Sequence, residues 1–148
     1  MFREHISGSG VQVILDIGGE LSEGIILEAG IIQNVFTLPV GVLDITEEIA
    51  RIEKTDYESG EVLYRKYIAG RLEPGQASKI DEVLRSAVIN WKPHFELAFK
   101  EMPAASRRSL NIFLVGGGAL LADAQGLIMA LEVMERMIVP PQMHQVDP

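Results

Sequence analysis

The sequence contains no cysteine. Disulfide bonds, zinc sites built on thiolates and cysteine nucleophiles are therefore all excluded. Basic residues are also few, because 13 lysines and arginines stand against 21 aspartates and glutamates, for a net charge of −8. Binding to nucleic acid or to an anionic lipid surface depends on clustered basic side chains, and no run of more than two occurs here. We therefore expect no nucleic-acid partner.

Long apolar runs are missing as well. A membrane-spanning helix needs about 20 consecutive, largely apolar residues, and no run in this sequence approaches that length. The N-terminus also lacks the apolar core of a secretory signal peptide. These two features predict a cytoplasmic protein without direct membrane insertion.

The composition that remains is typical of a globular domain. Of the 148 residues, 47% are hydrophobic and 23% are charged, which is enough for a single domain with its own core. Residues 1–10 end in a Ser-Gly alternation and predict a flexible linker. We expect the core to occupy residues 11–139 and a C-terminal tail to occupy residues 140–148.

The clearest chemical feature is a strand that runs into two glycines. Residues 11–30 read VQVILDIGGELSEGIILEAG. Apolar residues alternate from Val11, which predicts a strand with one buried face, and Asp16 lies near its end, before Gly18 and Gly19. Glycines let the backbone approach a ligand closely, and a carboxylate at a strand end can hold a hydrated cation. A glycine pair that only closes a hairpin is the alternative interpretation.

A second strand also runs into glycines. Residues 111–121 read NIFLVGGGALL, in which Gly116, Gly117 and Gly118 separate an apolar strand from a helical apolar pattern. Two such junctions, about a hundred residues apart in one domain, are the usual arrangement of a nucleotide site at strand ends. Together they predict a nucleotide crevice.

The chain as a whole predicts an α/β domain with a mixed sheet. Apolar segments at residues 11–17, 24–28 and 31–38 predict three consecutive antiparallel strands, followed by helices, a strand at residues 111–115 and a further helix. Asp44 and Glu47 resemble a capping box that opens the first helix.

Two later segments carry further expectations. A long helix bears an apolar stripe that includes Trp91, which we expect to lie in the core rather than to stack on a base, and Pro93 must kink or divide this helix. The C-terminal sequence MIVPPQMHQVDP predicts a short edge strand followed by a tail.

Four segments resemble a known superfamily. The first junction, DIGGELSE, is similar to the DIGGGTTD phosphate loop of the actin and heat-shock-chaperone ATPases, and the second is similar to their GGGAxLPGL adenosine loop. Between them, LPVGVLDITEEIARI resembles the PVGGxxITxDIA segment of the bacterial cell-division protein FtsA and, in related form, of the pilus-assembly protein PilM. YESGEVLYRKYIAG resembles the FEEAExLKxxYG helix that follows in those proteins. The matches occur in the family's order.

The resemblance implies the ribonuclease-H-like fold of an actin-like ATPase, and specifically its second domain. In that family ATP and magnesium lie in a cleft between two such domains, so one domain would offer half of a site. The resemblance also assigns Asp16 to the metal. The cofactor-binding residues that it implies, position by position, are Asp16, Gly18, Gly19, Ser22, Gly116, Gly117 and Gly118.

The function that the resemblance implies is that of a cytoplasmic scaffold. The chain would be a fragment or isolated domain of an FtsA-like or PilM-like protein that acts in the assembly of a cell-division or pilus machine. Its partners would be other subunits of that machine or further copies of itself. No catalytic residue is implied, and at most a weak ATPase activity is expected in a full-length parent.

Two departures from the family pattern leave alternatives open. Glu20 and Leu21 stand where the pattern has glycine and threonine, and a carboxylate about 4 Å from a phosphate costs on the order of 1 kcal/mol in water. A degenerate domain that binds no nucleotide and serves as a protein-interaction module is therefore one alternative. A two-metal nuclease or phosphotransferase with Asp16 and Asp123 as ligands is the other.

Overall fold

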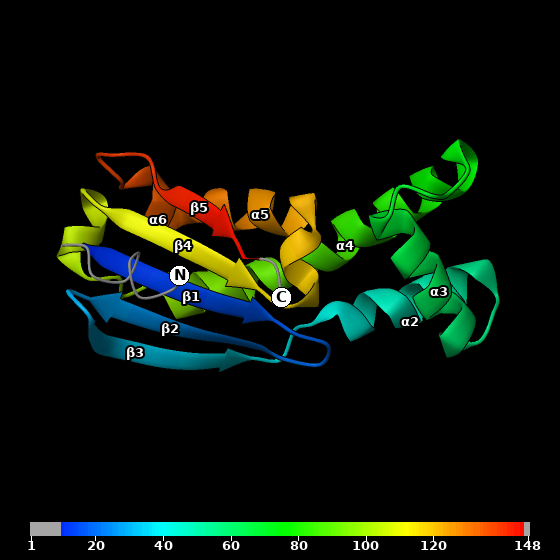
Figure 1. Cartoon of the computed structure of the whole chain (residues 1–148), viewed down its shortest axis with the longest axis horizontal. Helices are drawn as coiled ribbons and strands as arrows, with labels where there is room; N and C mark the ends of the chain where they lie inside the picture. The colour runs from blue at the N-terminus through cyan, green and yellow to red at the C-terminus, as the bar shows by residue number, and fades with distance from the viewer. Residues whose placement is uncertain (1–9, 147–148) are drawn as a thin grey trace.

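The computed structural model describes residues 10–146, so nearly all of the predicted N-terminal linker lies outside the described residues. Its centre is a five-stranded sheet with the strand order β3-β2-β1-β4-β5 (Figure 1). The neighbouring strands β1, β2 and β3 are antiparallel, whereas β4 runs parallel to β1 and β5 runs parallel to β4. The predicted mixed sheet is therefore confirmed. The strands are β1 Val11–Ile17, β2 Ser22–Glu28, β3 Ile31–Leu38, β4 Leu110–Val115 and β5 Gln142–Gln145.

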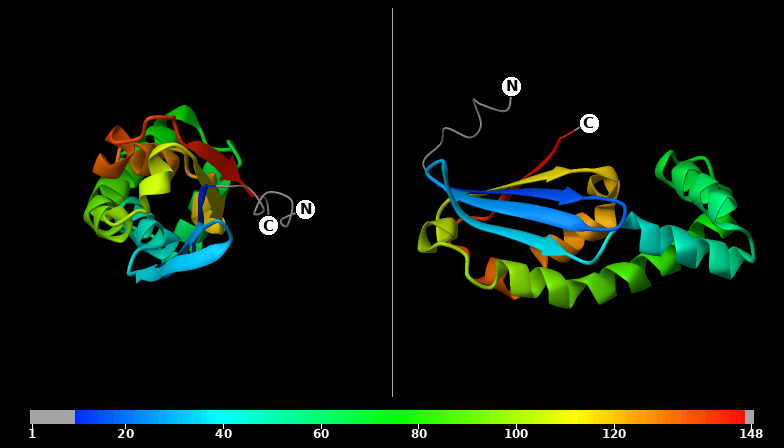
Figure 2. Two further views of the ribbon diagram at one scale, coloured as in Figure 1. Left: turned by 90° about the vertical axis from the view of Figure 1, so that its left-hand side faces the viewer. Right: turned by 90° about the horizontal axis from the view of Figure 1, so that it is seen from below.

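Helices cover one face of this sheet. The helix α4 runs along that face and continues beyond the edge of the sheet, where α2 and α3 pack beside its other end as a projecting arm (Figures 1 and 2). The helices are α2 Val42–Glu53, α3 Tyr57–Ile68, α4 Pro74–Phe99, α5 Ala122–Met129 and α6 Glu132–Glu135, with short 3-10 turns η1 Ala104–Arg107 and η2 Gly117–Leu120. Within the described residues, no helix combines the length and the apolar character needed to cross a bilayer.

The core lies between the sheet and α4. The inward residues of β1 are completely buried, as the alternation predicted, and Trp91 and Phe95 of α4 are buried beneath the sheet. Phe36 of β3 reaches the same helix, where its ring lies 5.9 Å from that of Phe99 between centroids. Trp91 is therefore a core residue, in agreement with its position in the apolar stripe.

Pro93 does not divide α4, which continues as one helix of 26 residues. Proline removes the hydrogen bond that its backbone nitrogen would donate to the carbonyl oxygen four residues earlier, here Ile89. Pro93 and Ile89 are both exposed, so solvent can reach the carbonyl oxygen that has lost its partner. Of the two predicted outcomes, a kink or a division of the helix, the division does not occur.

The start of α2 also differs from the prediction. The helix begins at Val42 behind Gly41, and no side chain caps it, so Asp44 and Glu47 do not form the expected capping box. Instead, the Val42 N–H donates to the Gly18 carbonyl oxygen at 3.0 Å and the Leu43 N–H donates to the Gly19 carbonyl oxygen at 2.8 Å. The glycine turn between β1 and β2 therefore caps α2, because its carbonyl oxygens satisfy donors that a helix leaves unpaired at its first turn.

The predicted edge strand near the C-terminus is present as β5, but it extends past the expected core boundary at residue 139. The ring of His144 stacks on Phe113 of β4 with a centroid separation of 4.8 Å, and its Nε2 lies 2.9 Å from the Asn111 Oδ1 atom. Most of the segment assigned to a C-terminal tail is thus held in the sheet, because these β4 side chains provide contacts that the local sequence does not reveal. Residues 147 and 148 lie outside the described residues.

Gly41 provides a test of the contact between α2 and the glycine turn. A Cβ atom at Gly41 would overlap the Gly19 carbonyl oxygen and lie 2.6 Å from the Gly19 carbonyl carbon. We expect Gly41→Ala to lower the free energy of unfolding by about 1–3 kcal/mol, the usual range for overpacking, as measured by urea denaturation. Gly126→Ala is the control, because no atom lies within 4 Å of a Cβ there, and we expect it to stabilise α5 by about 0.5–1 kcal/mol. Equal stability of the two variants would contradict this contact.

Tyr64 of α3 provides a test of the packing in the arm. Its hydroxyl group is buried and has no hydrogen-bond partner within the described residues, and burial raises the pKa of Tyr64 to about 12. A pKa raised above the unfolded value of about 10 means that the stability contributed by neutral Tyr64 is complete below pH 10 and is lost as the pH rises towards 12. We expect Tyr64→Phe to raise the free energy of unfolding by about 1 kcal/mol at pH 7 and to reduce the loss between pH 10 and 12.

The measurement for Tyr64→Phe is urea denaturation at several pH values. The matched control is Tyr57→Phe, which removes a hydroxyl group from an exposed tyrosine on the same helix. A destabilised Tyr64→Phe variant would show that the hydroxyl group has a partner in solution.

Candidate nucleotide site

The two glycine junctions meet at one edge of the sheet. The strands β1 and β4 are parallel neighbours, and Asp16 is in register with Val115, so both strands reach their glycines at the same end. A Cβ atom at Gly116 would overlap the Asp16 Oδ1 atom and lie 2.6 Å from the Ile17 carbonyl oxygen. Gly116 also has a φ of 84°, a conformation that favours glycine. The second junction therefore packs directly against the first, and only a glycine fits at the contact.

The first junction is a hairpin turn with free backbone donors. The Gly18 N–H donates to the Leu21 carbonyl oxygen at 3.0 Å, and the Gly18 and Gly19 carbonyl oxygens accept from α2. Within the described part of the chain, the N–H groups of Gly19 and Glu20 make no hydrogen bond. No atom lies within 4 Å of the place where a Gly19 Cβ would be. The turn thus closes a hairpin and still presents two adjacent donors to an open space, an arrangement that suits an anion such as a phosphate.

The second junction continues into the 3-10 turn η2 and then into α5. Gly118 lies against the side chain of Ile17 so closely that a Cβ atom would overlap it. The Gln125 Nε2 donates to the Ala119 carbonyl oxygen at 2.9 Å and so joins α5 to η2. Gln125 lies in the segment where the family pattern has a Pro-Gly turn, and here a side-chain hydrogen bond holds the turn in place.

Ser22 is turned away from this edge. Its side chain is completely buried, and its Oγ donates to the Val40 carbonyl oxygen at 2.8 Å. The hydroxyl group therefore joins β2 to the segment that leads into α2. Of the predicted cofactor-binding residues, Asp16 and the five glycines lie at the shared edge, whereas the Ser22 hydroxyl has an internal structural partner.

Carboxylates at this edge are not arranged for a two-metal centre. Asp16 is exposed and pairs across the strands with Glu23, and Asp123 lies on the first turn of α5. Within residues 10–146, however, no group of three or more histidine, aspartate or glutamate side chains is arranged to hold a metal ion. Two-metal catalysis relies on metal ions about 3.5–4 Å apart, each of which needs its own set of ligands. The prediction of such a centre at Asp16 and Asp123 is therefore not supported.

The sequence analysis did not identify Tyr67, which lies near Asp123. The Tyr67 hydroxyl of α3 donates to the Asp81 Oδ1 atom of α4 at 2.5 Å. Burial raises the pKa of Tyr67, and the neighbouring carboxylates of Asp81 and Asp123 raise it further. Tyr67 thus stays protonated at neutral pH and links the arm to α4 near the start of α5. No motif marks this pair, because it forms between helices that are separate in sequence.

Gly41 is a further residue of this edge, because it lies against the Gly19 carbonyl group directly before α2. One feature of the sequence could have indicated its contact with the Gly19 carbonyl group. A glycine stands directly before a helix that lacks a side-chain cap.

Comparisons with known proteins agree with this fold. No protein-family model and no curated protein sequence matches the chain. Among solved structures, the PilM-PilN type IV pilus biogenesis complex matches 99% of the chain with a TM-score of 0.72 at 20% identity. The ethanolamine utilization protein EutJ from Carboxydothermus hydrogenoformans matches 93% with a TM-score of 0.66 at 19% identity. MreB 5 of Spiroplasma citri, solved with AMPPNP bound, matches 93% with a TM-score of 0.66 at 16% identity.

The chain spans less than half the length of these structures. It covers 39% of the matched chain in the pilus complex, 45% of EutJ and 49% of MreB 5. Identities of 16–20% over almost the whole chain show a shared fold and nothing finer. The chain therefore has the fold of an actin-like ATPase domain.

Proposed function

We propose that this chain supplies one half of an ATP and magnesium cleft in an actin-like scaffold of the FtsA or PilM kind. The observation that carries the proposal is the meeting of the two glycine junctions, with Asp16 at their contact and the donors of Gly19 and Glu20 directed to open space. A hairpin without a ligand does not need a second glycine run beside it.

Each group at this edge has a role in the proposal. The Gly19 and Glu20 N–H groups would donate to phosphate oxygens, and the exposed Asp16 carboxylate would hold magnesium through its water shell. The backbone of Gly116, Gly117 and Gly118 would pack against the adenosine. Bound ATP would supply a negatively charged group that joins this domain to the opposite half of the cleft.

The comparisons support the proposal at the level of related folds. MreB 5 has been solved with AMPPNP, which places a nucleotide in one protein of this fold. PilM has been solved with PilN, which supports a protein partner in pilus assembly. Because the chain spans less than half of these structures, the other half of the cleft would come from a further domain. A cytoplasmic location is part of the same proposal.

A degenerate interaction module is the second candidate, and two observations favour it. The Ser22 hydroxyl has an internal partner, and the Gly18 and Gly19 carbonyl oxygens cap α2, so these residues have structural roles without any nucleotide. Glu20 adds a negative charge directly at the turn.

Nuclear magnetic resonance of the ¹⁵N-labelled chain separates the two candidates. During titration with magnesium-ATP to millimolar concentration, we expect the amide signals of Gly19 and Gly117 to shift in a saturable way. Gly75 and Gly126 lie on α4 and α5 in open surroundings and serve as internal controls. Asp16→Asn should weaken the response to magnesium-ATP more than the response to ATP in the presence of a chelator. Glycine signals that remain fixed throughout the titration would favour the degenerate module.

Glu20 is expected to limit the affinity for ATP. Its carboxylate would lie close to the phosphates, and a like-charge contact at about 4 Å costs on the order of 1 kcal/mol in water, which corresponds to about fivefold in the dissociation constant. We expect Glu20→Gln to tighten binding by about this factor in the same titration. Glu28→Gln removes the same charge at the opposite end of the β1–β2 hairpin and should leave the affinity unchanged. An equal effect of both variants would show that only the net charge matters.

A further inference from the structure

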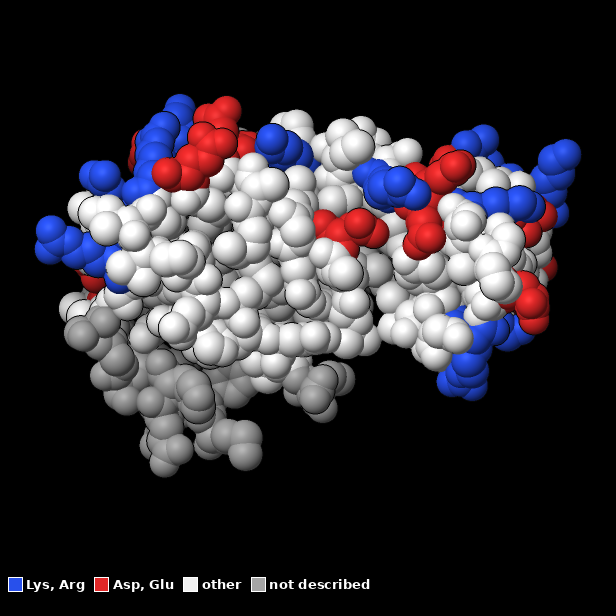
Figure 3. All heavy atoms as spheres, turned by 90° about the horizontal axis from the view of Figure 1, so that it is seen from above, with Lys and Arg blue, Asp and Glu red and all other residues white. Residues whose placement is uncertain are grey.

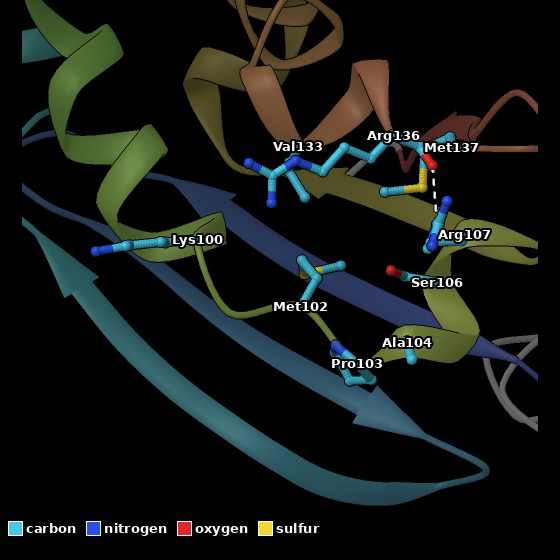
Figure 4. Close-up of a pocket in the computed structure, with 9 residues that line it drawn as sticks. All are labelled: Lys100, Met102, Pro103, Ala104, Ser106, Arg107, Val133, Arg136 and Met137. Carbon is cyan, nitrogen blue, oxygen red and sulfur yellow. Dashed lines mark hydrogen bonds between the residues drawn. The ribbon is translucent and has the colours of Figure 1, made fainter.

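A basic pocket lies at the opposite end of the sheet from the glycine junctions. It has a volume of about 320 Å³ and is enclosed by the end of α4, the segment before β4 and the helix α6 (Figure 4). Its lining residues are Lys100, Met102, Pro103, Ala104, Ser106, Arg107, Val133, Arg136 and Met137. None of them belongs to the candidate nucleotide site, so the pocket is independent of the function proposed above.

The charge of this pocket differs from that of the whole protein. The lining contains Lys100, Arg107 and Arg136 and no acidic residue, although the chain carries a net charge of −8. Within the described residues, none of these three side chains forms a salt bridge. Figure 3 shows basic side chains at this end of the molecule, with acidic side chains beside them. The Arg107 Nε atom donates to the Arg136 carbonyl oxygen at 3.2 Å, and the charged residues of the pocket lining are all basic, which favours a negatively charged ligand.

A buried hydroxyl group points into the same pocket. Ser106 is a buried residue that lines the pocket, and its backbone N–H donates to the Pro103 carbonyl oxygen at 2.9 Å. Figure 4 shows its oxygen directed towards the interior of the pocket, between Met102 and Met137. A hydroxyl group in this position can donate a hydrogen bond to a ligand in the pocket.

The rest of the lining is apolar and adaptable. Met102, Val133 and Met137 form the wall beside Ser106, and methionine side chains adjust to apolar groups of varied shape. A second hollow of about 540 Å³ shares Lys100, Val133 and Arg136 with this pocket, so the two form one groove between α4 and α6. The second hollow adds Glu96, Glu101 and Glu132, so the groove has only basic charged residues in the first pocket and residues of both signs in the second. An extended ligand fits such a groove better than a compact one does.

We propose that this groove binds an extended peptide segment of a partner protein in which an acidic residue has apolar neighbours. The carboxylate of the segment contacts Lys100 and Arg136 and accepts a hydrogen bond from the Ser106 hydroxyl. The neighbouring apolar side chain packs on Met102 and Met137. Charge complementarity favours this register, because the first pocket has no acidic lining residue whereas the second hollow has three.

The test uses the full chain with ¹³C-labelled methionine methyl groups and the probe peptide acetyl-Leu-Asp-Leu-amide. We expect the signals of Met102 and Met137 to shift in a saturable way, while that of Met129, on α5 and outside the pocket lining, stays fixed. The uncharged peptide acetyl-Leu-Asn-Leu-amide should bind about tenfold more weakly, since charge-assisted hydrogen bonds are about twice as strong as neutral ones.

Matched variants test the role of the positive charge. Arg136→Gln should weaken binding of the aspartate peptide by about tenfold. Arg71→Gln removes the same charge at an exposed position outside the groove and should leave binding unchanged. Equal binding by the two variants, equal binding of the two peptides, or fixed Met102 and Met137 signals would each overturn the proposal. Saturable shifts with inorganic phosphate but not with the peptide would also overturn it, because they would indicate a small-anion site.

Discussion

The parallel pairing of β1 with β4 is the constraint on which the rest of this structure depends. The two strands are almost a hundred residues apart in sequence, yet Asp16 and Val115 are in register across the pair. Because parallel strands end at the same edge of a sheet, this single pairing brings both glycine junctions together. The long return through α2, α3 and α4 is what allows the parallel connection, and α4 covers the sheet with the same residues that complete its core.

The glycine turn between β1 and β2 serves the fold and the candidate site at once. Its carbonyl oxygens cap α2, and its N–H groups at Gly19 and Glu20 have no acceptor within the described residues. Within the same two peptide units, the carbonyl oxygens and the N–H groups therefore have different roles. This arrangement joins the projecting arm to the edge that would hold nucleotide, because any shift of the turn also moves the acceptors of the first helical turn of α2. It also explains why Gly41 has so little space beside the turn.

The two ends of the sheet have opposite chemical character. The glycine edge carries the exposed carboxylates of Asp16, Glu20 and Glu23 beside backbone donors, so a phosphate there would depend on magnesium to offset the charge. The other end carries three basic side chains around the Ser106 hydroxyl group, which suits a carboxylate without any metal. A scaffold domain with a nucleotide at one end and a protein segment at the other would keep these ligands apart by the full length of β1.

The sequence by itself determined the elements and the two junctions. The alternation from Val11, the apolar stripe around Trp91 and the glycines after each strand act over a few residues, and local backbone and packing preferences decide them. Only the tertiary structure decided what those residues contact. The capping of α2 by Gly18 and Gly19, the inward Ser22 hydroxyl and the Tyr67–Asp81 hydrogen bond all join segments that are distant in sequence. A hydrogen bond of this kind depends on where a second element packs, and no short motif records that position.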